Sequence, residues 1–194
     1  MERNGNHATL VETSCESCSK IVADIAIDAT GRPAALARRL GADQLVKERL
    51  VAELLLHRGG RWGKCTPGWL YILGEPDSWT YRVSGPHNTL QEWRIARRPA
   101  GPPQPLNRCV DASPRQLSPV ADVNWLAIGD AALSFDPITS QGLFNALSTA
   151  LIVTGILQAD TALSEATANY YSACIQAVAN LSESVRKDVY ASLS

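Results

Sequence analysis

The chain has 194 residues, of which 45% are hydrophobic and 19% charged, a composition that indicates a globular protein with a core and excludes disorder throughout. Its 18 basic and 19 acidic residues give a net charge of −1, so charge favours neither nucleic acid nor an anionic membrane as a partner. The polar start of the sequence, residues 1–8, is not followed by an apolar segment, so we expect no secretory signal peptide and a cytoplasmic location.

The cysteines do not form a recognisable metal or redox framework. They are Cys15, Cys18, Cys65, Cys109 and Cys174. Only Cys15 and Cys18 have the spacing of a ligand or redox pair, and His7, His57 and His87 show no spacing that completes a zinc site. A redox dithiol normally opens a helix after a strand, whereas this pair lies in an expected hairpin. We therefore predict reduced cysteines with structural or incidental roles and no metal site, with a metal or redox pair as the alternative.

The first informative motif follows a predicted strand. Residues 21–28 place apolar side chains at every second position, which predicts a strand. It ends in Asp28-Ala29-Thr30-Gly31-Arg32, and residues 34–41 are expected to form a short helix. Aspartate and glycine after a strand are also ordinary turn residues, so this motif by itself leaves a purely structural role open.

The middle of the chain predicts antiparallel structure. Residues 50–56 predict a buried strand or a short helix, and residues 68–73 and 78–83 flank a Gly-Glu-Pro-Asp turn, which predicts a hairpin. The aromatic residues of this region are Trp62, Trp69, Tyr71, Trp79 and Tyr81. They can line a substrate pocket, although aromatics in antiparallel strands are more often core or cross-strand partners. Four prolines within residues 99–105 predict a linker.

The second motif joins a strand to a turn. Residues 125–128, Trp-Leu-Ala-Ile, are apolar on both faces, which predicts a buried strand. Gly129 permits a sharp turn, and Asp130 then presents a carboxylate that can accept hydrogen bonds from sugar-like hydroxyls. The alternative is an ordinary strand, turn and helix in which Asp130 caps a helix.

The segment after this turn predicts a helix with an open N-terminus. Asp136-Pro137 prevents the helix from starting early, which leaves the N–H groups of Gln141, Gly142 and Leu143 at the positive end of the helix dipole. Such an end stabilises negative charge.

Two helices are predicted at the C-terminal end, over residues 140–157 and 161–190. The uncharged stretch over residues 137–159 is long enough to raise the question of a membrane span, but polar residues interrupt it. We expect a helix buried in an α/β domain.

The two motifs, in this order, resemble those of FAD-dependent monooxygenases of the p-hydroxybenzoate hydroxylase fold, in the branch of flavin-dependent halogenases and related hydroxylases. The resemblance implies an α/β fold: a partial FAD/NAD(P)-binding Rossmann-like domain with a small antiparallel β substrate region and C-terminal helices. By resemblance, the Asp130 carboxylate binds the ribityl chain of FAD, and the amides of Gly142 and Leu143 face the pyrimidine edge of the isoalloxazine ring. The residues expected to bind the cofactor are Asp28, Ala29, Thr30, Gly31, Gly129, Asp130, Pro137, Gln141, Gly142 and Leu143.

The Gly-x-Gly-x-x-Gly turn that receives the pyrophosphate in such proteins does not occur in these residues. Residues 59–63 come nearest, but their spacing is wrong, and we expect a hairpin or loop there. The chain is therefore expected to be the C-terminal portion of the family domain. Residues 1–45 and 106–194 would belong to the FAD-binding part and residues 46–105 to a reduced substrate segment. Without that turn we expect FAD to bind weakly or not at all to this chain alone.

The function implied is that of an FAD-dependent oxidoreductase, a monooxygenase or halogenase, incomplete and inactive alone. NAD(P)H or reduced flavin would supply electrons, a small-molecule or peptide-borne aromatic compound would be the substrate, and a partner subunit would supply the missing half. No side chain is singled out as a general acid or base. Two alternatives stay open: a non-catalytic interaction subunit of a split flavoprotein, and a flavin-dependent reductase of the same superfamily.

Overall fold

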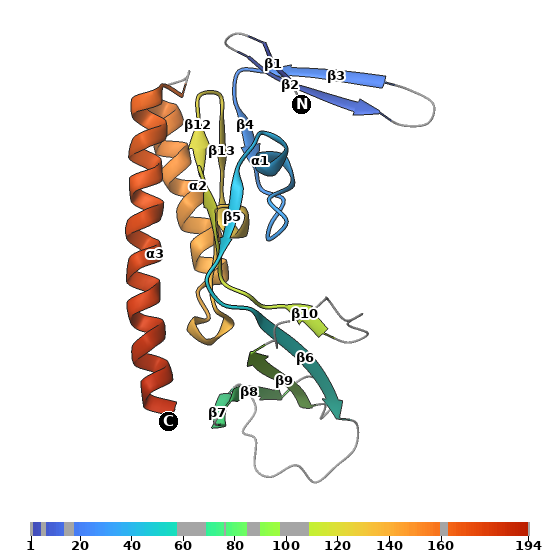
Figure 1. The fold of residues 1–194 in the computed structure, drawn as a ribbon, viewed down its shortest axis with the longest axis vertical. Helices are drawn as coiled ribbons and strands as arrows, with labels where there is room; N and C mark the ends of the chain where they lie inside the picture. Colours follow the sequence, from blue (N-terminus) through green and yellow to red (C-terminus); the bar gives the residue numbers. More distant parts are fainter. Residues whose placement is uncertain are drawn as a thin grey trace. The chain divides into compact units, whose positions relative to one another are not determined.

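The computed structural model describes residues 2–4, 7–13, 18–57, 69–75, 77–84, 90–97, 109–159 and 163–193 (Figure 1). The chain forms two compact units. The first comprises residues 1–46 and 115–184, and the second comprises residues 47–114 and 185–194. Cys15, Trp62, Cys65, residues 59–63 and the proline-rich linker at 99–105 lie outside the described residues.

The described residues of the first unit form three small sheets. The N-terminal antiparallel sheet consists of β1 (Glu2–Asn4), β2 (His7–Thr13) and β3 (Cys18–Ala23). The second sheet consists of β12 (Ala121–Asp122), β13 (Trp125–Ala127) and β4 (Ala26–Asp28), and β4 and β13 are parallel. The third, antiparallel sheet consists of β14 (Leu133–Ser134), β11 (Arg115–Ser118) and β5 (Asp43–Val46). The two sequence motifs therefore follow neighbouring parallel strands.

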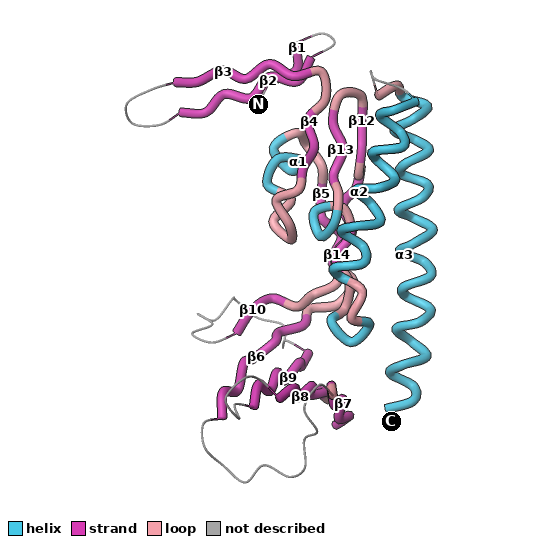
Figure 2. Tube along the Cα trace, turned by 180° about the vertical axis from the view of Figure 1, so that it is seen from behind, coloured by secondary structure: helices cyan, strands magenta, loops and turns pink. Residues whose placement is uncertain are grey.

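The helices found in the described residues connect or follow these strands. They are α1 (Ala35–Arg39), the 3-10 helices η2 (Gly129–Ala131) and η3 (Pro137–Thr139), α2 (Gly142–Ala159) and α3 (Glu165–Leu193). The three predicted helices are confirmed to within a few residues at each end. Figure 2 shows α2 and α3 lying side by side, and residues of both line one groove.

The core of the first unit forms around β13. Trp125, Leu126 and Ala127 are all buried, as the apolar stretch predicts. Tyr171 of α3 is fully buried against them, and its hydroxyl donates a hydrogen bond of 2.7 Å to the carbonyl oxygen of Ala127. Burial raises the pKa of Tyr171 well above its ordinary value, so the phenol stays neutral. The long last helix is thereby fastened to the strand that leads into the second motif.

The described strands of the second unit form one antiparallel sheet in the order β10-β6-β9-β8-β7. Its strands are β6 (Leu50–His57), β7 (Leu70–Glu75), β8 (Ser78–Ser84), β9 (Leu90–Arg97) and β10 (Cys109–Asp111). The predicted hairpin is confirmed as β7 and β8, and the segment from Leu50 is a strand. The expected fold class, α/β with antiparallel sheet and C-terminal helices, is the one observed.

One predicted strand is wrong in its extent. Residues 21–28 form parts of two strands, because the chain bends at Asp24 and the strands on either side belong to different sheets. The alternation of apolar side chains continues across the bend, because side chains alternate with a period of two in any sheet. The pattern alone therefore could not show that two different strands are involved. Ile21 and Val22, on the N-terminal side, are 52% and 56% exposed, whereas Asp28 on the other side is fully buried.

Candidate functional site

Both oxygens of the Asp28 carboxylate accept hydrogen bonds from the first motif and the helix that follows it. One oxygen accepts hydrogen bonds from the backbone N–H and hydroxyl of Thr30, at 2.9 and 2.6 Å, and the other accepts one of 2.7 Å from the N–H of Ala37. The Thr30 hydroxyl also accepts a hydrogen bond from the N–H of Ala35. Asp28 therefore fixes the turn and the start of α1 from inside the protein.

The residues after Asp28 face outward. Ala29 and Thr30 are exposed, and Gly31 has a φ of +73°, a conformation that favours glycine. A Cβ added at Gly31 would meet nothing within 4 Å, so open space lies beside this residue. If the first motif contacts a ligand, these three residues can do so directly and Asp28 acts by holding them in place.

Gly129 brings the second motif close to α2. Its φ is +56°, and its N–H donates a hydrogen bond of 2.9 Å to the hydroxyl of Thr149. A Cβ at this position would lie 3.3 Å from the Cβ of Ala146, so a side chain would push the helix away. Asn145 adds a second link, because its side-chain amide donates a hydrogen bond of 2.7 Å to the carbonyl oxygen of Leu133. The turn and the helix are thus held in close contact.

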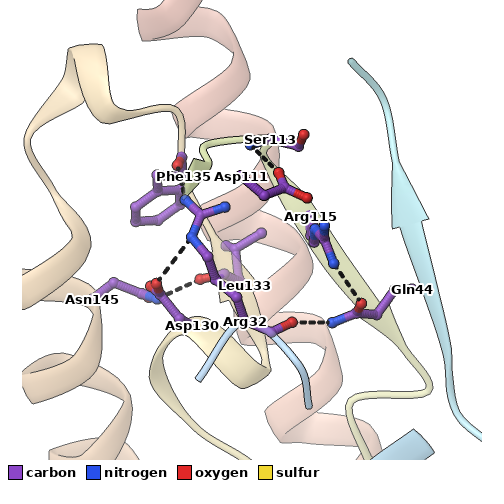
Figure 3. A network of polar contacts seen from close by, with 9 residues as sticks. All are labelled: Arg32, Gln44, Asp111, Ser113, Arg115, Asp130, Leu133, Phe135 and Asn145. Carbon is purple, nitrogen blue, oxygen red and sulfur yellow. Dashed lines mark hydrogen bonds and ion pairs between the residues drawn. The ribbon is translucent and has the colours of Figure 1, made fainter. Parts of the chain in front are cut away.

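Arg32 connects the two motifs (Figure 3). Its Nε lies 3.7 Å from a carboxylate oxygen of Asp130, and its Nη2 donates a hydrogen bond of 3.3 Å to the carbonyl oxygen of Phe135. The carbonyl oxygen of Arg32 accepts a hydrogen bond of 2.6 Å from Gln44, which in turn accepts one from Arg115. Arg32 is therefore held both at its backbone and at its guanidinium group.

The Asp130 carboxylate lies at the centre of this arrangement. Its side chain is 36% exposed, and a Cβ added at Gly142 would lie 4.0 Å from its Oδ1. Partial burial raises the pKa of Asp130, and the positive charge of Arg32 counteracts part of that rise. Within the described residues no backbone N–H donates to this carboxylate, so Asp130 does not cap a helix there. The capping alternative is not supported.

The entrance of α2 is open, as the sequence predicts. Asp136 caps η3 by accepting a hydrogen bond of 3.0 Å from Ile138, and Pro137 occupies the first turn of that short helix. Helix α2 begins only at Gly142. The N–H groups of Gly142, Leu143 and Phe144 have no partner in the part of the chain that is described. Of these three residues, Gly142 is the one that lies beside the Asp130 carboxylate.

The second unit contains a cavity of about 470 Å³ that includes one predicted aromatic residue. Trp79 lies in its wall, is 2% exposed and donates a hydrogen bond of 3.0 Å from its indole N–H to the hydroxyl of Tyr190. Tyr81 instead stacks on Trp93 of the neighbouring strand, with ring centroids 6.3 Å apart. Trp69 is 64% exposed. Of the aromatic residues considered for a substrate pocket, Trp79 therefore lines this cavity and Tyr81 is a cross-strand partner.

Sequence reasoning did not select Arg32, Asn145 or Thr149 for the site. Asn145 and Thr149 carried a usable signal, because they are polar residues four apart in an apolar helix and both are buried. Arg32 stood beside the predicted residues, but its pairing with Asp130 depends on the parallel register of β4 and β13. The described residues hold no group of three His, Cys, Asp or Glu side chains that could bind a metal ion.

Solved structures identify the fold. CmlS, a flavin-dependent halogenase, superposes with a TM-score of 0.72 at 16% identity, covering 88% of this chain and 37% of CmlS. OxyS anhydrotetracycline hydroxylase from Streptomyces rimosus gives 0.70 at 16% identity, covering 95% and 43% of the respective chains. 2,6-Dihydroxypyridine-3-hydroxylase from Arthrobacter nicotinovorans superposes with a TM-score of 0.69 at 13% identity, covering 96% of this chain and 64% of that protein.

The chain has part of the flavin monooxygenase fold. It corresponds to well under two thirds of the length of the two neighbours first named, and nearly all of it is matched. No protein-family model matches the sequence, and no curated protein matches it. At this level of identity the likeness describes the flavin monooxygenase fold and not a specific activity.

Proposed function

We propose that this chain is part of a flavin-dependent oxidoreductase of the hydroxylase or halogenase type and that it forms the ribityl and ring side of an FAD site. The observation that carries the proposal is the Asp130 carboxylate beside Gly142, the first residue of a helix whose first backbone N–H groups have no partner among the described residues. A carboxylate accepts hydrogen bonds from hydroxyls, and helix N-terminal amides favour negative charge. A sugar alcohol joined to a ring that becomes anionic on reduction presents both kinds of group.

The residues present fit such a cofactor. Gly142 has no side chain to fill the space beside Asp130, since an added Cβ would lie 4.0 Å from the carboxylate. Ala29 and Thr30 are exposed, and open space lies beside Gly31. Arg32 prevents the carboxylate from standing alone as a partly buried charge. Pro137 lies in η3, the short helix before α2, and the carbonyl oxygen of Gln141 accepts the N–H of Asn145 in the first turn of α2.

In the proposed enzyme the chain positions the cofactor and adjusts its charge. When bound, the flavin would supply redox chemistry with NAD(P)H or reduced flavin as the electron source. Asp130 would orient the ribityl hydroxyls, and the Gly142 and Leu143 amides would stabilise negative charge at the pyrimidine edge. An aromatic small molecule or peptide-borne side chain would be the substrate, and the location would be cytoplasmic.

The surface of α2 supports completion by further polypeptide. Leu143, Phe144, Leu147 and Leu151 are 76%, 72%, 59% and 72% exposed, so the expectation that this helix is buried is wrong for these residues. By length and composition alone α2 could cross a membrane, and 22% of it is buried in this structure. We favour a protein cover, because α2 is bound through buried Asn145 and Thr149 to the turn of the second motif. A helix that is apolar on all sides is normally enclosed.

An NMR titration tests the cofactor site directly. We expect FAD to bind this chain weakly and to shift the amide signals of Gly129, Asp130, Gly142 and Leu143 in a two-dimensional 1H–15N spectrum. Asp130→Asn should lower the affinity severalfold, because a neutral amide accepts hydroxyl hydrogen bonds less strongly. Asp43→Asn, at an exposed position of β5, is the matched control and should change nothing. Shifts confined to other regions, or none when the titration is repeated on the complex with the partner that supplies the missing half, would refute the proposed site.

The interaction-subunit alternative draws on the same exposed face of α2. It predicts no shift at Asp130 or Gly142 with any flavin, even after the chain has been joined to a partner. The two functions are therefore separated by the titration repeated on the complex. The reductase alternative differs in its reaction, and oxygen uptake during NAD(P)H oxidation by the completed enzyme distinguishes the two reactions.

A further inference from the structure

Strand β7 is the outermost described strand on one side of the second unit's sheet, and β10 is the outermost on the other (Figure 1). We propose that the outer edge of β7 pairs with β7 of a second copy of this chain, antiparallel and about a two-fold axis at Ile72. The two sheets would then continue into each other. This surface belongs to the second unit and shares no residue with the proposed flavin site.

The two edges of this sheet differ in length and composition. β10 has three residues and ends in Asp111, and short or charged edge strands resist pairing with other chains. β7 has six residues, Leu-Tyr-Ile-Leu-Gly-Glu, and contains no lysine, arginine or proline. Its Leu70, Ile72 and Leu73 are exposed. Among the described strands β7 pairs only with β8, so every second residue directs its backbone groups outward, toward an added strand.

A cavity lies over the sheet beside Gly74. The register sets Gly74 opposite Trp79, and Trp79 opposite Ile95, so these three residues share one face. All three line the cavity of about 470 Å³, together with Tyr190 of α3. Because Gly74 has no side chain, the outermost strand contributes no apolar group to this row. A large side chain of a neighbouring strand that covers an edge glycine stabilises a sheet.

Pairing of β7 with itself supplies such a side chain at both ends. Residues directly opposite in an antiparallel pair point to the same face, so the two-fold axis must pass through a residue position and not between two residues. With the axis at Ile72, this residue faces Ile72 of the other copy. Leu70 of each copy then faces Gly74 of the other, at the edge of the cavity. One leucine thus covers each glycine.

The same register is compatible with the charges of the strand. Glu75, the charged residue of β7, faces Trp69 of the other copy, so no like charges stand opposite one another. An axis at Leu73 would instead set Leu70 against residue 76, a proline that follows the end of β7 and has no N–H to donate. The axis at Ile72 therefore uses the strand better.

The pair is closed and small. Each copy contributes its β7 edge to the other, so the two edges occupy each other and the pairing does not propagate into a fibre. Stable complexes bury roughly 1,200–2,000 Å² in total, and a single strand edge of six residues is a smaller surface. We therefore expect a dimer that forms as the concentration of the chain rises.

Charge substitutions at the axis test the pairing. Ile72→Lys or Ile72→Glu alone sets two like charges opposite each other, whereas a mixture of the two variants sets lysine opposite glutamate. A fluorescently labelled Ile72→Lys chain is titrated with unlabelled Ile72→Glu or with unlabelled Ile72→Lys, and sedimentation velocity measures association. We expect the oppositely charged mixture to associate about tenfold more tightly. Equal affinities in the two mixtures would overturn the proposal.

The design separates this contact from association through α2, because the exposed leucines of α2 are the same in both mixtures. Val110→Lys and Val110→Glu are the matched controls. Val110 is exposed on the opposite edge strand, and the register places it on the same face as Ile95. Their two mixtures should associate equally. A difference as large as that at Ile72 would show general attraction between charges and would also overturn the proposal.

Hydrogen exchange of the wild-type chain gives an independent measurement that needs no substitution. With rising chain concentration we expect the outward-facing amides of β7 to exchange severalfold more slowly, while the amides of β10 keep their rates. Unchanged exchange along β7 at the highest soluble concentration would overturn the pairing. If these amides slow only when a different polypeptide is added, the edge serves a foreign strand and the second copy is ruled out.

Discussion

The hydroxyl of Tyr171 donates a 2.7 Å hydrogen bond to the carbonyl oxygen of Ala127, the last residue of the strand before the second motif. Both groups are buried, and α3 is joined to β13 by this bond. The geometry of the turn at Gly129 and Asp130 therefore depends on a helix that begins more than thirty residues later in the chain, at Glu165.

Tyr171→Phe should destabilise the chain. The substitution keeps the ring and removes the donor, leaving the buried Ala127 carbonyl without its partner, which costs about 1–3 kcal/mol of unfolding free energy. Urea denaturation followed by circular dichroism measures the difference. Tyr170→Phe is the control, because Tyr170 is 62% exposed, and it should change the midpoint little. Equal effects of the two substitutions would contradict the importance of the buried bond.

The same tyrosine predicts how stability depends on high pH. Burial raises the folded-state pKa of Tyr171, so the folded chain holds the phenolic proton at pH values where the unfolded chain releases it. The stabilisation is fully present below about pH 10, the ordinary tyrosine value, and is lost as the pH rises above it. Thermal unfolding should show a steeper loss of stability above that pH for the wild type than for Tyr171→Phe. Parallel curves would refute this role.

Asp130→Asn should raise the melting temperature at neutral pH while weakening ribityl binding. The folded-state pKa of Asp130 is raised by burial, despite Arg32, so the ionised carboxylate disfavours the folded state once the pH exceeds that pKa. The gain from asparagine should therefore be present near neutral pH and disappear in acid, where aspartate is protonated. Calorimetry at several pH values checks this. A gain that does not change with pH would point to a cause other than charge.

Gly142→Ala should separate stability from ligand binding. The added methyl group would lie 4.0 Å from the Asp130 carboxylate, an ordinary contact, so the fold should be retained. The methyl would occupy the space needed by a hydroxyl of the ribityl chain, and the affinity for FAD should fall severalfold. Gly155→Ala is the matched control in the same helix, because its added Cβ meets nothing within 4 Å. It should add about 0.5–1 kcal/mol of stability and leave binding unchanged.

The exposed face of α2 should cause the isolated chain to associate. Light scattering after size-exclusion chromatography is expected to show species larger than a monomer, and a dye that binds apolar surface should fluoresce with the chain. Leu147→Gln combined with Leu151→Gln should reduce both effects, because these side chains are 59% and 72% exposed. A monomeric wild type that does not bind the dye would show that the face needs no cover, while association with detergent or lipid vesicles alone would favour a membrane.

Local structure was predictable where the signal lies in neighbouring residues. The apolar stretch at residues 125–128, the delay of α2 by Asp136-Pro137 and the β7–β8 hairpin follow from short-range chemistry, and the structure confirms them. Strand β9 was not predicted, because its sequence Leu-Gln-Glu-Trp-Arg-Ile-Ala-Arg is rich in charge and its polar side chains pair across the sheet, as in the 2.6 Å ion pair of Arg82 with Glu92.

The site was predictable only in part. The sequence points to Asp130 and the amides of α2, but the partner that stabilises the carboxylate, Arg32, is brought there by the pairing of Asp28 with Ala127 in two distant strands. The inward direction of the Asp28 carboxylate could not be predicted from the sequence either, since an aspartate in a turn can point toward a ligand or hydrogen-bond its own backbone. Such choices are decided by tertiary packing.

Strand β4 offers very little to an added strand. The Ala26 N–H donates to Asn124 and the Asp28 carbonyl accepts from Ile128, so both of these backbone groups are directed toward β13. In a parallel ladder the groups of the intervening residue, Ile27, point the opposite way. A three-residue strand thus offers about one backbone donor and one backbone acceptor to an added strand, which is too few to select one partner sequence over another. The choice between candidate polypeptides would therefore depend on how well their side chains pack against the leucines of α2. Backbone hydrogen bonds to β4 would only align the added strand.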